Sequence, residues 1–160
     1  MSEDLKLDYN LSRAEMYQAI IPQIKGLISG ESDHIANISN IIAVLKEAFQ
    51  FFWVGVYFVK GDTLVLGPFQ GPVACTRIKK GQGVCGSSWD RKETIVVENV
   101  DEFPGHIACS SQSKSEIVLP AFKNSEVALV LDIDSNQLAD FDHVDKMYLT
   151  EIVKLIEEVI

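Results

Sequence analysis

The chain has 160 residues and carries a formal net charge of −9 at neutral pH. Proteins that bind nucleic acid or anionic membranes need a basic surface, so this charge argues against both kinds of partner. Apolar residues make up 47% of the chain, which is enough to build a hydrophobic core and argues against disorder. This length is typical of one domain, and we expect a single domain over residues 1–160.

The amino-terminal sequence MSEDLKLDYN lacks the basic start and the apolar run of a secretion signal. Even the most apolar stretch, FFWVGVYFV, is far too short to span a bilayer. We therefore expect a cytoplasmic protein, in a compartment where stable structural disulfides are rare.

Helical patterns occupy both ends of the chain, over about residues 12–49 and 142–160. Ser12-Arg13-Ala14-Glu15 is a capping-box pattern and is expected to open the first helix. A second helix is predicted to begin near Ser32 or Asp33 and to bury apolar side chains at helical spacing, namely Ile35, Ile38, Ile42, Leu45 and Phe49.

Strand-like patterns fill the region between them, about residues 51–134. FFWVGVYFV and TLVLGPF are separated by a turn signal, and further strands are predicted at 94–97, 116–120 and 127–132. Terminal helices around a central antiparallel sheet predict an α+β domain. The segments 67–86 and 100–115 are expected to be long loops, which is where functional residues tend to lie.

The three cysteines, Cys75, Cys85 and Cys109, fall in or beside these loops. Each could simply pack as a small apolar side chain. Cys109, however, has polar, turn-rich surroundings, and His106 lies three residues before it; a nearby imidazolium would lower the pKa of the thiol. An acyl-transfer dyad of this cysteine and histidine is an alternative, but no third residue or oxyanion-hole motif accompanies it.

A zinc site is a second alternative, with Cys75, Cys85, Cys109 and His106 as four potential ligands. Structural zinc sites normally take their ligands in close pairs, and only His106 and Cys109 form one. We therefore expect no metal.

Acidic side chains end one of the predicted strands. Asp132 and Asp134 are two residues apart, so they point to the same face, while Leu131 and Ile133 are left for the core. A hairpin could bring Glu116, at the start of the neighbouring strand, beside them. Three carboxylates in one pocket would raise at least one pKa by repulsion and would suit an ammonium ligand.

Aromatic residues alternate on the strand FWVGVYF. Trp53, Gly55 and Tyr57 share one face, and although alternating aromatics usually pack in a core, a glycine between two rings is expected to leave a slot. Aromatic walls with acidic groups can hold a cationic or sulfur-bearing ligand.

Together, the segments WVGVYFVKGDTLVLGPFQGPVAC, GQGVCG, FPGHIAC, SEIVLP and VLDIDS resemble the free methionine-(R)-sulfoxide reductases, which have the GAF fold. The resemblance covers about residue 41 to the carboxyl terminus, and it implies a single GAF-like domain. It implies that Cys109 is the nucleophilic cysteine, Cys75 the resolving cysteine, and Cys85 an auxiliary one.

For the substrate, the resemblance implies binding carboxylates at Glu116, Asp132 and Asp134 and an aromatic wall at Trp53 and Tyr57. The proton donor is expected to be Glu116 or Asp134. Family members often have Asp where this chain has Ser110, and that difference removes a carboxylate beside the nucleophile.

The implied reaction is reduction of free methionine sulfoxide through a cysteine sulfenic acid and an intramolecular disulfide, with thioredoxin as the reductant. No cofactor is implied, and a homodimer that acts in oxidative stress is expected. The alternative function is a GAF-type binding module that senses a small molecule or redox state.

Overall fold

The structure is a computed structural model that describes residues 4–107 and 109–160. In chain order its elements are α1 (Arg13–Ile28), α2 (His34–Phe49), β1 (Trp53–Lys60), β2 (Thr63–Gln70), β3 (Arg77–Lys79), α3 (Gly83–Arg91), β4 (Ile95–Val97), the 3-10 turn η1 (Val100–Glu102), β5 (Ser115–Lys123), β6 (Glu126–Ser135) and α4 (His143–Val159).

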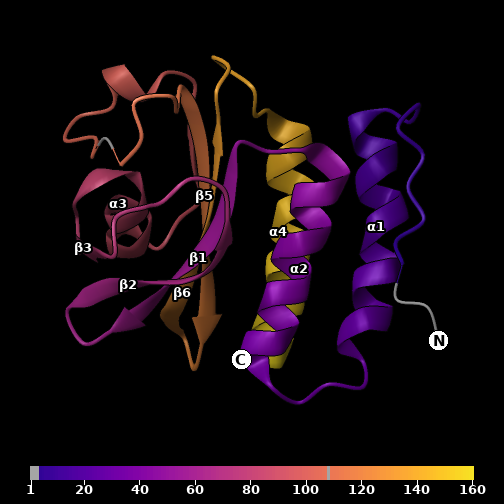
Figure 1. Ribbon diagram of the computed structural model, residues 1–160. Helices are drawn as coiled ribbons and strands as arrows, with labels where there is room; N and C mark the ends of the chain where they lie inside the picture. The colour runs from indigo at the N-terminus through magenta and orange to yellow at the C-terminus, as the bar shows by residue number, and fades with distance from the viewer. Residues whose placement is uncertain (1–3, 108) are drawn as a thin grey trace.

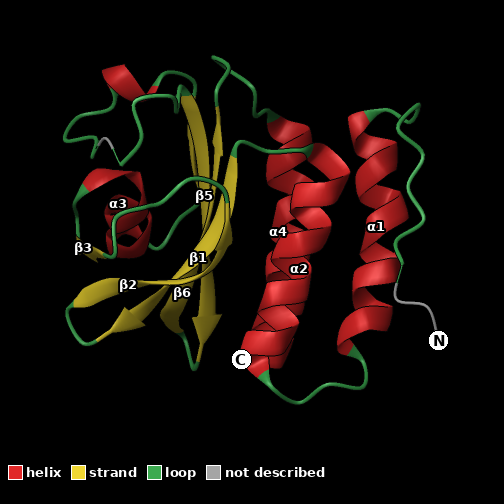
Figure 2. Ribbon diagram, viewed as in Figure 1, coloured by secondary structure: helices red, strands yellow, loops and turns green. Residues whose placement is uncertain are grey.

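The strands form a six-stranded antiparallel sheet in the order β3-β2-β1-β6-β5-β4. Two hairpins, β1–β2 and β5–β6, meet where β1 pairs with β6 at the centre of the sheet. Helices α1, α2 and α4 lie on one side of the sheet, whereas α3 lies on the other side, near the edge strand β3 (Figures 1 and 2). The predicted α+β class with terminal helices is confirmed.

Side-chain caps fix the starts of the long helices. The Glu15 backbone N–H donates to the Ser12 hydroxyl over 3.2 Å, and the Glu15 carboxylate accepts from the Ser12 N–H over 3.1 Å, which is the predicted capping box. Asp33 caps α2 by accepting from the Ala36 N–H, and Asp142 opens α4 with a second capping box. Such caps stabilise a helix by about 1 kcal/mol each.

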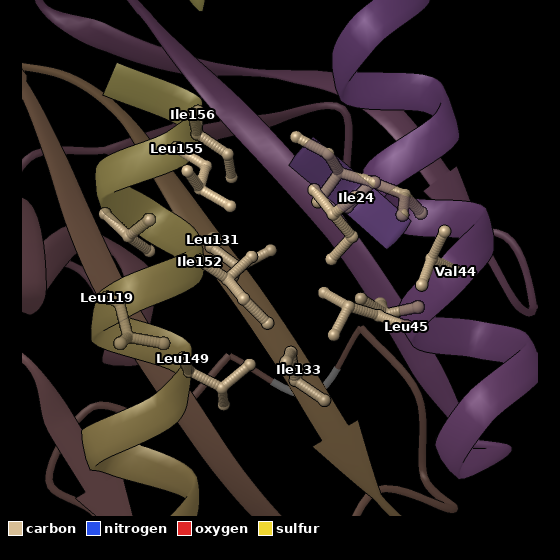
Figure 3. Close-up of a cluster of buried hydrophobic side chains, with 14 of the residues drawn as sticks. Ile24, Val44, Leu45, Leu119, Leu131, Ile133, Leu149, Ile152, Leu155 and Ile156 are labelled. Carbon is tan, nitrogen blue, oxygen red and sulfur yellow. The ribbon is translucent and has the colours of Figure 1, made fainter. Parts of the chain in front are cut away.

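The main core lies between the sheet and the long helices. Aliphatic side chains of β5 and β6 pack there against α1, α2 and α4 (Figure 3). Burying a single Leu or Ile stabilises a fold by about 1.5–3 kcal/mol, so this layer supplies most of the hydrophobic stabilisation. Its central members are Ile24, Leu45, Leu119, Leu131, Ile133, Leu149, Ile152 and Ile156.

The predicted loop at 67–86 is wrong in part. Strand β2 continues to Gln70, β3 follows, and α3 begins at Gly83. The glycines and serines of α3 give no apolar pattern at helical spacing, so the sequence pattern does not predict this helix. Its stability comes from burial rather than from helix propensity. A Cβ at Gly86 would lie 2.4 Å from the Lys79 carbonyl oxygen, so only glycine lets the helix approach β3 this closely.

Two of the side chains expected to be buried in α2 are not fully so. Ile35 lies in the first turn of the helix and is 42% exposed, and Phe49 in the last turn is half-buried. The other three are buried as predicted.

Among the described residues, none of the helices has the length and apolar character that crossing a bilayer requires.

Candidate active site

Three carboxyl groups meet on the face of the sheet that carries α3. Asp132 and Asp134 alternate along β6 and therefore share this face, as predicted. In the strand register Glu116 of β5 lies directly opposite Asp134, while on the other side β1 places Trp53 opposite Asp134 and Gly55 opposite Asp132. Pairing of strands that are distant in sequence thus brings acidic and aromatic side chains into one row.

Burial sets the protonation of these carboxyl groups. Glu116 and Asp132 are each 6% exposed. Burial, reinforced by repulsion from Asp132, raises the pKa of Glu116 and of Asp134 well above their ordinary values. Burial raises the pKa of Asp132 to about 6. Of the three groups Asp132 therefore ionises most readily, while burial favours the protonated forms of Glu116 and Asp134.

Asp132 also has an unused acceptor. Its Oδ1 atom is buried and has no hydrogen-bond partner among the described residues. A buried acceptor without a partner is unfavourable, so a ligand that donates a hydrogen bond here would relieve that cost.

A disulfide joins Cys75 to Cys109, with their Cα atoms 5.5 Å apart. Cys75 lies in the loop between β2 and β3, and Cys109 lies in the segment between η1 and β5. Two of the three cysteines are therefore bonded to each other, and the four-ligand zinc arrangement is not formed.

His106 does not provide the charge that the sequence suggested. It lines the same cavity as Cys109, but partial burial lowers the pKa of its imidazole. A neutral ring cannot stabilise a thiolate as an imidazolium does. The hypothesis that His106 activates Cys109 by its charge is therefore not supported.

Cys85 lies apart from the disulfide, within α3. Its side chain is 4% exposed, and its Sγ lies 3.9 Å from the Glu116 Oε1. Burial and the nearby carboxyl groups raise the pKa of this thiol well above its ordinary value. Cys85 is therefore a protonated, buried thiol packed against the acidic cluster.

A cavity of about 50 Å³ connects these groups. Aromatic residues, acidic residues and the disulfide-bonded Cys109 share its wall. Such a site combines a potential nucleophile, proton donors and an anionic binding group. Its lining includes Phe52, Trp53, Tyr57, Cys85, His106, Ile107, Cys109, Ser110, Ser113, Glu116, Asp132 and Asp134.

The slot predicted above Gly55 is wrong. A Cβ on Gly55 would lie 2.6 Å from Cη2 of Trp53, so the tryptophan ring itself occupies that space. The indole stacks on Phe69, with ring centroids 5.3 Å apart, and on Tyr57 at 6.0 Å. The aromatic wall is therefore a continuous stack, and the absence of a side chain at Gly55 leaves room for the indole.

Curated proteins similar to this chain span nearly all of it. The chain is 54% identical over 158 residues to GAF domain-containing protein A of Dictyostelium discoideum, covering 98% of this chain and 99% of the relative. It is 40% identical over 158 residues to the free methionine-R-sulfoxide reductase of Saccharomyces cerevisiae, covering 93% of this chain and 88% of the relative. The chain belongs to the free methionine-R-sulfoxide reductase family of GAF-domain proteins.

Solved structures agree with this family. The X-ray structure of the free methionine-R-sulfoxide reductase from Neisseria meningitidis in complex with its substrate superposes with a TM-score of 0.96. The two chains are 49% identical, and the match covers 99% of this chain and 95% of the other. No protein-family model matches the chain.

Family membership confirms the resemblance drawn from the motifs, whereas the role of each residue stays a prediction.

Ser113 is a further residue of the site that the sequence did not predict. Its hydroxyl donates to the Asp134 Oδ1 over 2.5 Å, and both residues line the cavity of this reductase-family site. The segment SSQSKS offers several serines, and no spacing signal distinguishes Ser113 from the others.

Proposed function

We propose that this chain reduces free L-methionine-(R)-sulfoxide to methionine, with the Cys109 thiolate as the nucleophile. The observation that carries the proposal is a disulfide-bonded Cys109 in the wall of a cavity that also contains Glu116, Asp132 and Asp134. Membership of the reductase family supports the same activity.

Asp132 is the group best suited to the substrate's ammonium. It is the carboxyl that ionises most readily of the three, and its buried Oδ1 lacks a hydrogen-bond donor. An ammonium supplies both the charge and the donor, whereas a peptide nitrogen is uncharged. The substrate is therefore the free amino acid, and the stacked rings of Trp53 and Tyr57, which line the cavity, suit its sulfur-bearing side chain.

The reaction needs a proton as well as a nucleophile. The Cys109 sulfur attacks the sulfoxide sulfur, the S–O bond of the substrate breaks, and the oxygen ends on Cys109 as a sulfenic acid. The substrate sulfur is reduced and the cysteine sulfur is oxidised. Glu116 or Asp134 donates the proton, because burial raises the pKa of each carboxyl group and so favours its protonated form.

The second stage regenerates the thiol. The Cys75 thiol attacks the Cys109 sulfenic acid, so the S–S bond forms, the S–O bond breaks and water leaves. A dithiol of the thioredoxin class then reduces this disulfide by thiol–disulfide exchange. Cys85 is auxiliary, because its buried thiol keeps its proton. No cofactor enters the cycle.

The protein acts in the cytoplasm under oxidative stress, as a homodimer. Exposed apolar side chains on the long helices, such as Met147 at 56% exposure, support an interface there. Light scattering of the purified protein tests this part: a mass of one chain at micromolar concentration would contradict the dimer.

Three substrates test the main proposal, with dithiothreitol as reductant. We expect methionine from free L-methionine-(R)-sulfoxide, and little product from the S epimer or from N-acetyl-methionine-(R)-sulfoxide. Acetylation removes the ammonium charge on which the role assigned to Asp132 depends, and it also adds bulk at the nitrogen. Equal turnover of the acetylated compound would contradict an ammonium site.

Cys75→Ser tests the regeneration step. The variant should still release roughly one methionine per chain, because Cys109 is intact, but it should fail to recycle efficiently with thioredoxin. Normal cycling of Cys75→Ser with thioredoxin would transfer the resolving role to Cys85.

A further inference from the structure

Two side chains of β1 donate hydrogen bonds to the loop that carries Cys75. The Tyr57 hydroxyl donates to the Cys75 carbonyl oxygen over 3.0 Å. The Trp53 Nε1–H donates to the Pro72 carbonyl oxygen, also over 3.0 Å. Since Trp53 and Tyr57 are two residues apart on one strand, a single strand face holds this loop at two backbone positions.

Packing that involves neither bonded cysteine fixes both donors. The indole of Trp53 is stacked between Phe69 and Tyr57. The loop begins in direct contact with it, because a Cβ at Gly71 would lie 2.6 Å from Cδ1 of Trp53. Burial, with the nearby Asp132, raises the pKa of Tyr57, so the phenol keeps the proton that it donates.

Apart from these hydrogen bonds, the loop is held near Cys75 by partial packing of Ala74 and Cys75 against the apolar cluster on this face of the sheet. Val73 at its tip is 88% exposed, and Cys75 is half-buried. Beyond Cys75 the chain is fixed again where the Leu66 N–H donates to the Thr76 carbonyl oxygen over 3.0 Å. Between Pro72 and Thr76, the hydrogen bond from Tyr57 is made to the backbone of Cys75 itself.

We propose that Tyr57, aided by Trp53, is a positioning residue for disulfide formation, holding the backbone of Cys75 where its thiol reaches Cys109. The proposal rests on the proposed function only for the sulfenic acid that Cys75 meets during turnover. Positioning raises the effective concentration of one sulfur near the other. It therefore also stabilises the disulfide of the free protein, with no substrate present.

That consequence can be measured as a thiol–disulfide equilibrium. Purified protein is equilibrated with reduced and oxidised dithiothreitol, which exchange two electrons with the Cys75–Cys109 pair, and the thiols are trapped by alkylation and counted by mass. Tyr57→Phe removes only the hydroxyl. Loss of one such hydrogen bond predicts a disulfide about three- to tenfold easier to reduce. For a two-electron couple this is a potential about 15–30 mV more oxidising.

Tyr17→Phe is the matched control. Its hydroxyl is also buried and donates over 2.7 Å, but to Asp145, on the side of the sheet that the long helices cover. This variant should lower the stability of the fold and leave the disulfide potential unchanged. Trp53→Phe removes the second donor while keeping an aromatic ring, and it should shift the potential in the same direction as Tyr57→Phe.

The outcomes separate positioning from general destabilisation. If Tyr57→Phe shifts the potential no more than Tyr17→Phe does, the positioning role is wrong. Should Tyr57→Phe fail to fold, the Trp53→Phe potential decides the question in the same way. Because no substrate is present, a failure here leaves the reductase proposal intact, and an inactive enzyme with the expected shifts would contradict only the reductase proposal.

Discussion

The two faces of the central strands are built from alternate residues of the same chain segments, yet they have opposite characters. On β6, Leu131 and Ile133 are fully buried among the aliphatic side chains of the long helices. Their neighbours Asp132 and Asp134 face α3 and the disulfide loops. Buried carboxyl groups weaken a fold, whereas buried aliphatic groups stabilise it. The helix-covered face thus stabilises the sheet, whereas the other face carries carboxyl groups that are needed for the proposed reaction and not for folding.

The largest effect expected on the acidic face comes from Cys109→Ser. No other group in the cavity is assigned to attack sulfur, so this variant should release no methionine even in a single turnover. Cys75→Ser is the matched control, since it alters the other half of the disulfide and keeps the nucleophile. Rapid-quench assays with stoichiometric reduced protein measure both, and methionine release by Cys109→Ser would contradict the assignment.

The acidic groups should give the next largest effect. Glu116→Gln and Asp134→Asn each remove a carboxylic acid and keep the shape of the side chain. General acid catalysis typically contributes about a hundredfold to ten-thousandfold, so the variant that lacks the proton donor should release methionine more slowly by that factor. The assay is the single-turnover rate across pH. An unchanged rate in both variants would mean that neither residue is the donor.

A substitution one residue away should have the opposite signature. Ile133→Ala empties space in the helix-covered core and should lower the free energy of unfolding by about 2–5 kcal/mol. Asp134→Asn should change stability far less, and it should slow catalysis if Asp134 is the proton donor. Urea unfolding and single-turnover rates, measured on both variants, make the comparison. It fails if Ile133→Ala slows methionine release as strongly as Asp134→Asn at a temperature where both are folded.

The smallest effect expected is a pH dependence of stability that arises from Asp132. Its pKa is about 6 in the folded protein, against about 4 in an unfolded chain. The folded state therefore binds this proton more tightly, and the resulting stabilisation, on the order of 2–3 kcal/mol, is present below pH 4 and lost by about pH 6. Glu116, Asp134, Cys85 and Tyr57 surround the group.

Asp132→Asn should remove that dependence. Urea unfolding at pH 4 and at pH 7 gives the free energy of unfolding of both proteins. The value for the wild type minus the value for the variant should be larger at pH 4 than at pH 7. The substitution also removes the repulsion that raises the pKa values of Glu116 and Asp134, so the difference reports Asp132 together with its effect on these two neighbours. A difference in stability that does not change with pH would show that the folded-state pKa of Asp132 is not raised.

The sequence predicted this division of faces well wherever local periodicity determines it. The alternation of Leu131, Asp132, Ile133 and Asp134 alone fixes which side chains share a face. The proximity of Glu116 followed from expecting a hairpin between neighbouring strands, and the register confirms it. Short-range patterns were sufficient in these cases because the partners lie close together in the chain.

Features that depend on long-range packing could not be predicted in this way. Helix α3 is glycine- and serine-rich and owes its stability to its burial against the sheet. The ring of Trp53 fills the space above Gly55 because of Phe69 on the neighbouring strand. The hydrogen bond between Ser113 and Asp134 depends on how a long loop folds back over the sheet. Periodicity carries no information about these contacts.

A single turnover without added reductant tests the central claim most directly. Fully reduced protein is mixed with one equivalent of free L-methionine-(R)-sulfoxide, and methionine, remaining thiols and the bonded cysteines are then determined. The account predicts roughly one methionine per chain, the loss of two thiols, a disulfide between Cys75 and Cys109, and Cys85 still reduced. No methionine, or a disulfide that contains Cys85, would contradict it.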